Sequence, residues 1–173
     1  GGGHLLGHSV GGLVASQAVI DGLHPRSLTL LCSGPGALPA DRGGGLADLA
    51  AALEANSLEQ IWQHMPAAQQ EMPAEVREFV HRRWVSNTPE HLRQVVHILR
   101  SQPDLTPALR RGLDGAPVAI VWGEDDDAWP IAQQRTMAAE LGAQAVELVA
   151  CGHSPNVDDP AALVAALLDA WAD

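Results

Sequence analysis

The chain has 173 residues, of which 46% are hydrophobic, and its 21 acidic and 10 basic residues give a formal net charge of −11. This length suits one domain with a real core, and no apolar run approaches the roughly 18 residues of a membrane span. The acidic balance argues against a nucleic-acid partner, whose phosphates need basic side chains. Cys32 and Cys151 show no metal-ligand spacing, so we expect small buried hydrophobes rather than a disulfide framework or a zinc site. We therefore expect a cytoplasmic protein without a nucleic-acid or membrane partner.

The first predicted elements form a strand–helix–strand unit. Residues 4–7, HLLG, are a short apolar run that ends in glycine, as a strand can. A helical pattern follows over 10–22 and stops at Gly22. The continuous apolar run SLTLLC, 27–32, predicts a strand buried on both faces, and 33–45 has the composition of a loop.

The middle of the chain, 46–112, contains no strand-like run and has helical periodicity throughout. Three prolines fall where a first helical turn would begin, and Thr88 and Thr106 stand before two of them as N-caps. Strand and helix patterns then alternate to the end of the chain. We therefore predict a parallel α/β sheet of about four strands, formed by 1–45 and 113–173 and interrupted by the helical segment.

The segment Gly7–Gly11 matches the pattern G-x-S-x-G between the first predicted strand and helix. On a sharp turn there, Ser9 would have a strained backbone, and glycines on either side would prevent collision of the strand with the helix. The turn also puts the amide of Val10 at a helix N-terminus, where it can stabilise an oxyanion. Because the chain has 17 glycines, the same pattern can also arise by chance.

A serine nucleophile needs a base and an acid that orients the base. Seven of the eight histidines are read as surface or core-edge residues, whereas His153 follows a predicted strand, where α/β sheets place their sites. Four consecutive acids, 124–127, also follow a strand. A solvated turn and a magnesium site are alternative interpretations of this run. The order serine, acid, histidine, each after a strand, favours a catalytic triad.

Three segments together resemble the α/β-hydrolase superfamily, specifically its capped members with a serine nucleophile. They are GHSVGG at 7–12, VWGEDDDAWP at 121–130 and GHSPNVDDP at 152–160. The resemblance implies that Ser9 is the nucleophile, His153 the base and Asp126 the acid. Asp126 stands three residues after the glycine that ends its strand, in the family's G-x-x-D pattern, while Asp125 and Asp127 remain alternatives.

The same resemblance implies acyl transfer through an acyl-enzyme, with Val10 as an oxyanion donor and Gly7 and Gly11 supporting the turn. It implies a small-molecule substrate and requires neither a metal nor an organic cofactor. Residues 46–112 stand where the family has its cap. A small apolar ester is the expected substrate, and amide, lactone, carbon–carbon, peracid and acyl-transfer chemistry stay open.

The chain departs from the resemblance ahead of Ser9, where the family normally has several further strands and helices. Those segments also supply a second oxyanion donor, and loss of one donor typically costs on the order of 10²–10³ in turnover. We therefore expect the C-terminal part of a longer hydrolase, weak or inactive alone, with an exposed first strand open to self-association. A non-catalytic, hydrolase-like binding protein is the alternative function.

Overall fold

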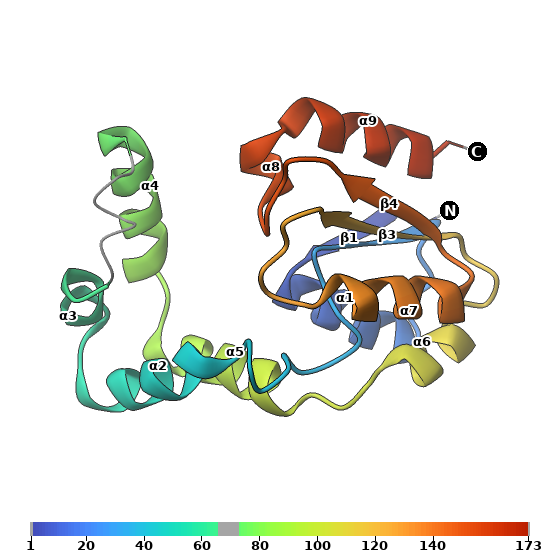
Figure 1. Ribbon diagram of the computed structural model, residues 1–173. Helices are drawn as coiled ribbons and strands as arrows, with labels where there is room; N and C mark the ends of the chain where they lie inside the picture. Colours follow the sequence, from blue (N-terminus) through green and yellow to red (C-terminus); the bar gives the residue numbers. More distant parts are fainter. Residues whose placement is uncertain (1, 66–72, 173) are drawn as a thin grey trace. The chain divides into compact units, whose positions relative to one another are not determined.

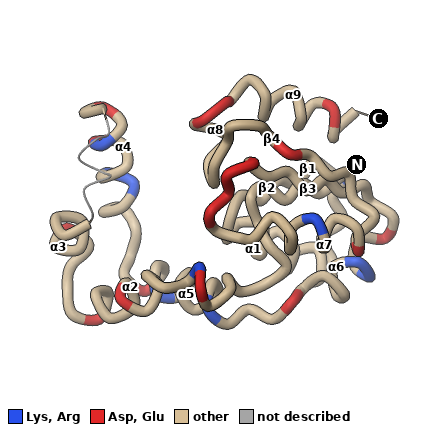
Figure 2. The backbone as a smooth tube through the Cα atoms, in the orientation of Figure 1, with Lys and Arg blue, Asp and Glu red and all other residues tan. Residues whose placement is uncertain are grey.

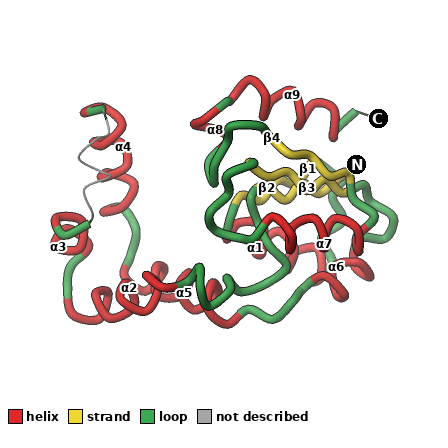
Figure 3. The backbone as a smooth tube through the Cα atoms, in the orientation of Figure 1, coloured by secondary structure: helices red, strands yellow, loops and turns green. Residues whose placement is uncertain are grey.

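The computed structural model describes residues 2–65 and 73–172, and Figure 1 shows their course. They fall into two compact units, one formed by Gly1–Arg42 with Ser101–Asp173 and the other by Gly43–Arg100. All strands of the described residues lie in the first unit (Figure 3). None of the described helices has the length and apolar character needed to cross a membrane.

The first unit is built on a four-stranded parallel sheet, which confirms the predicted fold class. The strands follow one another across the sheet in chain order. They are β1 (His4–His8), β2 (Ser27–Leu31), β3 (Val118–Gly123) and β4 (Gln144–Leu148). All five residues of β2 are buried, as its unbroken apolar run predicts. Among the described residues β1 forms an edge of the sheet, and self-association through it stays a prediction.

Helices cover both faces of this sheet (Figure 1). One face packs against α1 (Val10–Ile20), α6 (Thr106–Gly112) and α7 (Ile131–Leu141), and the other against α9 (Pro160–Ala170), which follows the short α8 (Pro155–Asp158). Alternate residues of each central strand point to opposite faces. In β3, for example, Ile120 and Trp122 join one core and Ala119 and Val121 the other.

The second unit contains four helices in its described residues. They are α2 (Gly44–Ala55), α3 (Leu58–Gln63), α4 (Ala74–Val85) and α5 (Pro89–Ser101), the last of which reaches the unit boundary. Ser57 begins α3 with a capping box to Gln60. A small core of leucine, isoleucine and valine side chains holds the helices together. The boundaries differ from the predicted 46–112 mainly by α6, whose Leu109 is buried in the core beneath the sheet.

Candidate active site

The turn between β1 and α1 holds Ser9 in a backbone conformation that side chains rarely adopt, with φ 56° and ψ −129°. Its amide donates to the Leu31 carbonyl at 2.9 Å, and its carbonyl accepts from the Gly12 amide at 2.9 Å. These two bonds support the strained turn. Val10 is the first residue of α1, so its amide points out of the helix with no carbonyl one turn earlier to accept it.

Two glycines, at 7 and 12, allow β1 and α1 to approach closely. A Cβ at Gly7 would collide with the carbonyl of Gly11, and a Cβ at Gly12 would collide with the Ser33 side chain. At Gly11 nothing lies within 4 Å of the added Cβ. The expectation that Gly11 prevents a collision is therefore wrong, and Gly12, directly after the G-x-S-x-G pattern, has that role instead.

We expect this difference to appear in a series of alanine substitutions. Gly7→Ala and Gly12→Ala should each lower the free energy of unfolding by about 1–3 kcal/mol, because both overfill a packed contact. Gly11→Ala should leave it unchanged or raise it, since alanine is the better helix former. Urea unfolding curves of the three variants measure this, and equal losses in all three would contradict the assignment.

Residues from the ends of three strands meet in one hydrogen-bonded chain. His153 Nε2 lies 2.9 Å from Ser9 Oγ, and His153 Nδ1 lies 2.8 Å from Asp126 Oδ1. The three sequence-predicted residues, up to 144 positions apart, are thus in direct contact. Of the acidic run in the β3–α7 loop (Figure 2), Asp126 is buried, whereas Asp125 and Asp127 are exposed.

The Asp126 carboxylate is enclosed by donors. Besides His153, its Oδ1 accepts from the Ala128 amide at 3.0 Å, and its Oδ2 accepts from Gln134 Nε2 at 2.8 Å. Burial raises the pKa of Asp126, but the hydrogen bonds from His153, Ala128 and Gln134 outweigh it and leave the pKa below its ordinary value. The ionised carboxylate favours the tautomer with a proton on Nδ1, which leaves Nε2 of His153 free to accept from Ser9.

The lowered pKa of Asp126 predicts a pH-dependent contribution to stability. A carboxylate with a lower pKa in the folded than in the unfolded protein stabilises the fold above the unfolded pKa, about 3.9. That contribution is lost as the pH falls through the folded value. Wild-type protein should therefore lose stability below about pH 4 more steeply than Asp126→Asn. Urea unfolding between neutral and acid pH measures this, with the exposed Asp127→Asn as control; parallel curves for wild type and Asp126→Asn would contradict it.

Further hydrogen bonds fix the loop that carries His153. His8 Nε2 lies 2.7 Å from the His153 carbonyl and donates to it, and the Gly152 amide donates to Asp158 Oδ2 at 2.8 Å. From the sequence alone, His8 is interpreted as a surface or core-edge histidine, and no role is predicted for Gln134. The position of His8 next to Ser9 is a sequence signal for its role. No feature of the sequence indicates the role of Gln134.

One cluster of described residues has the ligand types of a metal site. The ligand atoms of His8, Cys32 and His153 lie within 4.8 Å of one another. Burial, however, raises the pKa of the Cys32 thiol to about 12, which opposes the thiolate that a metal needs. Both ring nitrogens of His153 are also occupied by Ser9 and Asp126. We therefore interpret the cluster as hydrogen-bonded support for the histidine loop.

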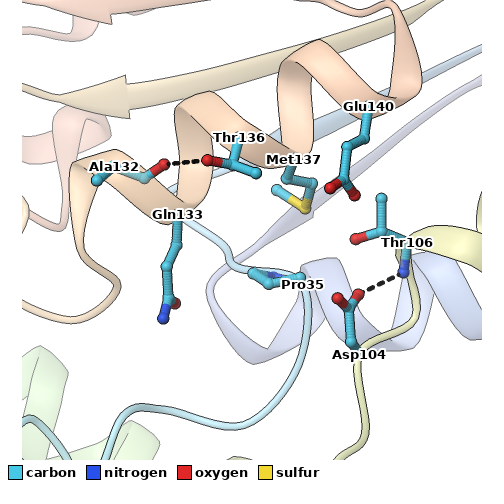
Figure 4. Close-up of a pocket in the computed structure, with 8 residues that line it drawn as sticks. All are labelled: Pro35, Asp104, Thr106, Ala132, Gln133, Thr136, Met137 and Glu140. Carbon is cyan, nitrogen blue, oxygen red and sulfur yellow. Dashed lines mark hydrogen bonds between the residues drawn. The ribbon is translucent and has the colours of Figure 1, made fainter.

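A pocket of about 320 Å³ lies between α6, α7 and Pro35, and none of the three residues of the chain Ser9–His153–Asp126 lines it (Figure 4). The carboxylates of Asp104 and Glu140 border it. Its Thr106 hydroxyl has no hydrogen-bond partner in the described part of the chain but is shut off from solvent. A bound ion could not reach that oxygen, so the pocket offers two exposed carboxylates and no built cation site.

Comparison with known proteins identifies the family. Residues 1–167 match the Alpha/beta hydrolase family, and the chain belongs to it. The predicted superfamily is thereby confirmed. No curated protein matches the chain significantly.

Solved structures share the fold at low sequence identity. A carboxylesterase of the thaumarchaeon Nitrososphaera gargenis is 14% identical with a TM-score of 0.77, over 96% of this chain and 63% of its own. A hydrolase from Pseudomonas aeruginosa PA01 is 24% identical with a TM-score of 0.77, over 98% and 64%. A bromoperoxidase from Bacillus anthracis is 15% identical with a TM-score of 0.77, over 98% and 67%. The chain therefore spans about two thirds of the length of these structures.

Proposed function

We propose that the protein is a serine hydrolase that works through an acyl-enzyme, with Ser9 as nucleophile, His153 as base and Asp126 as orienting acid. The observation that carries the proposal is the continuous chain from Ser9 Oγ through both nitrogens of His153 to Asp126 Oδ1, with distances of 2.9 and 2.8 Å. Serine hydroxyls are common, but few are hydrogen-bonded to a histidine that a buried carboxylate orients.

In the proposed reaction, His153 Nε2 takes the proton of Ser9 as Oγ attacks the carbonyl carbon of the ester. The amide of Val10, at the N-terminus of α1, donates to the oxyanion that forms. His153 then gives its proton to the leaving alkoxide, and the carbon–oxygen bond breaks to leave an ester on Ser9. Water attacks this ester with His153 again as base, and the acid product and free Ser9 are released.

We propose a small apolar ester as the substrate. Carboxylesterases are among the structures that share this fold. The helical unit, described by itself, contains a mostly apolar pocket of about 580 Å³ that includes Leu49, Ile61 and Met65 in its lining. The role of this unit as a cap, the small-molecule substrate and the cytoplasmic location remain predictions.

A fluorophosphonate probe tests the proposal, because it phosphonylates only a serine that a neighbouring base activates. We expect one equivalent of label on the wild-type chain and none on Ser9→Ala. Ser154→Ala is the matched control, since Ser154 lies beside His153 but its side chain makes no capping bond to α8. Label that persists on Ser9→Ala would contradict the nucleophile. A wild-type chain that takes no label would agree with the expectation that this part is inactive alone, and the longer protein that the resemblance implies would then be labelled. Absence of label on that protein as well would favour the alternative of a non-catalytic binding protein.

A further inference from the structure

A fully buried glutamine lies behind the acid of the proposed triad. Gln134, in the first part of α7, is 0% exposed. Its Nε2 donates to Asp126 Oδ2 at 2.8 Å and to the Trp129 carbonyl at 3.2 Å. Its Oε1 is buried and has no hydrogen-bond partner among the residues that the structure describes. The amide therefore faces the acid with its donors and leaves its acceptor unpaired.

This arrangement is costly for the fold. A buried amide oxygen without a donor destabilises a protein, whereas an apolar side chain of the same size would avoid the penalty. The other buried positions of α7, Met137 and Ala138, are apolar. The orientation of the amide is also set by Asp126, because a carboxylate accepts from the NH₂ group and repels the amide oxygen. A buried amide with an unpaired oxygen among apolar neighbours indicates that Asp126, the residue it contacts, requires the hydrogen bond.

The Asp126 carboxylate needs a hydrogen-bond donor at its Oδ2 atom in particular. Asp126 Oδ1 accepts from His153 and the Ala128 amide, whereas Oδ2 accepts from Gln134. The Cys32 thiol also interacts with this carboxylate, but its high pKa makes it a weak donor. The last torsion of an aspartate is soft, so a donor on a single oxygen leaves the carboxylate plane poorly defined. Donors on both oxygens hold Oδ1 in line with His153 Nδ1.

The same amide ties the acid to the turn before α7. Its second bond goes to the carbonyl of Trp129, a fully buried residue whose Nε1 donates to the Gly36 carbonyl at 3.1 Å. The Trp129 ring also lies 6.2 Å, centroid to centroid, from the ring of His153. Gln134 thus connects the acid to a buried, hydrogen-bonded residue whose ring lies beside His153.

We infer that Gln134 is a positioning residue of the site, which orients the Asp126 carboxylate toward His153 through its hydrogen bond to Oδ2. Its effect on turnover rests on the proposed function, but its effect on the Asp126–His153 hydrogen bond does not. At metal sites, partners that orient a ligand through a hydrogen bond typically affect activity by about 10- to 100-fold, and we expect an effect of the same size here.

Gln134→Met tests this inference, because methionine keeps the length of the side chain and removes the donor. We expect kcat on a p-nitrophenyl ester to fall by about 10- to 100-fold with KM nearly unchanged, since the substrate does not contact Gln134. The exposed neighbour Gln133→Met is the matched control and should behave as wild type. In proton NMR, the downfield signal of the His153 Nδ1 proton should shift or broaden in Gln134→Met only.

Gln134→Glu provides a second variant with a distinctive pH profile. Its carboxyl group can donate to Asp126 only while protonated, and a buried carboxyl beside a carboxylate holds its proton to higher pH than usual. The titratable groups in this cluster are Asp126, His153 and the Cys32 thiol. We expect kcat relative to wild type to be highest at the acid end of the active range and to fall as pH rises.

The outcomes separate the inference from the proposed function. If wild type turns over ester and Gln134→Met matches it in kcat and in the His153 signal, the positioning role is wrong. If Gln134→Glu follows the wild-type pH profile, it is also wrong. If neither the wild-type chain nor the longer protein that the resemblance implies reacts with the probe or turns over ester, the proposed function fails. A changed His153 signal in folded Gln134→Met would still support the positioning role.

Discussion

Ser9→Ala is expected to reduce kcat on a p-nitrophenyl ester by about 10⁴- to 10⁶-fold, down to the rate left by binding and oxyanion stabilisation alone. In the proposed reaction the Ser9 hydroxyl oxygen, 2.9 Å from His153 Nε2, forms the bond to the acyl group. A water molecule in its place could hydrolyse an ester directly but could not form an acyl-enzyme. Initial rates of purified wild type and variant, with circular dichroism to show that both are folded, measure the effect.

Alanine should also relieve none of the backbone strain at this turn, because φ 56° is unfavourable for alanine as well as serine. The unfolding midpoint of Ser9→Ala is therefore expected near that of wild type, and the loss of rate cannot come from unfolding. A decrease in kcat smaller than about tenfold would mean that another group is the nucleophile.

Asp126→Asn is expected to reduce kcat by about 10⁴-fold, the effect known for loss of the acid in a serine triad. The side-chain amide that this substitution introduces would favour the tautomer of His153 that carries its proton on Nε2, and that tautomer cannot accept the proton of Ser9. The burial of Asp126 makes the loss large, since solvent cannot replace the carboxylate there.

The neighbouring acids provide controls at matched positions. Asp125 and Asp127 are exposed, and the backbone bonds made at these positions, with the Cys151 carbonyl and with Arg42, do not use their side chains. Asp125→Asn and Asp127→Asn should therefore keep kcat within about threefold of wild type, as surface substitutions normally do. If either of these variants loses about 10³-fold or more in kcat while Asp126→Asn stays active, the orienting acid is the residue at that position and not Asp126.

The fold was predictable because its signals are local in the sequence. Each strand is a short apolar run, and the strand–helix alternation alone favours a parallel sheet with helices on both faces. The contact of Ser9 with His153 was predictable for a related reason, since the carboxyl ends of parallel strands share one edge of the sheet. The assignment of Ser9, Asp126 and His153 to one proposed triad came from their order in the chain, which matches that of the family.

The unpredicted residues depend on contacts between distant segments. Gly12 matters because Ser33 faces it from the end of β2, and His8 matters because the His153 loop passes beside it. Gln134 looks like an ordinary polar residue of a helix, and its burial against Asp126 is a property of the folded chain only. The sequence also places α6 within the helical segment 46–112, because a helical pattern does not indicate which of two cores the helix packs against.

Intact-mass spectrometry can show whether Ser9 becomes covalently acylated. Wild-type protein mixed with p-nitrophenyl acetate at mildly acid pH, where deacylation is slow, should gain the mass of one acetyl group. Peptide mapping should place that group on residues 4–20, at Ser9, and Ser9→Ala should gain none. An acetyl group found on another residue, or an unmodified chain that nevertheless hydrolyses the ester, would show that Ser9 is not the nucleophile.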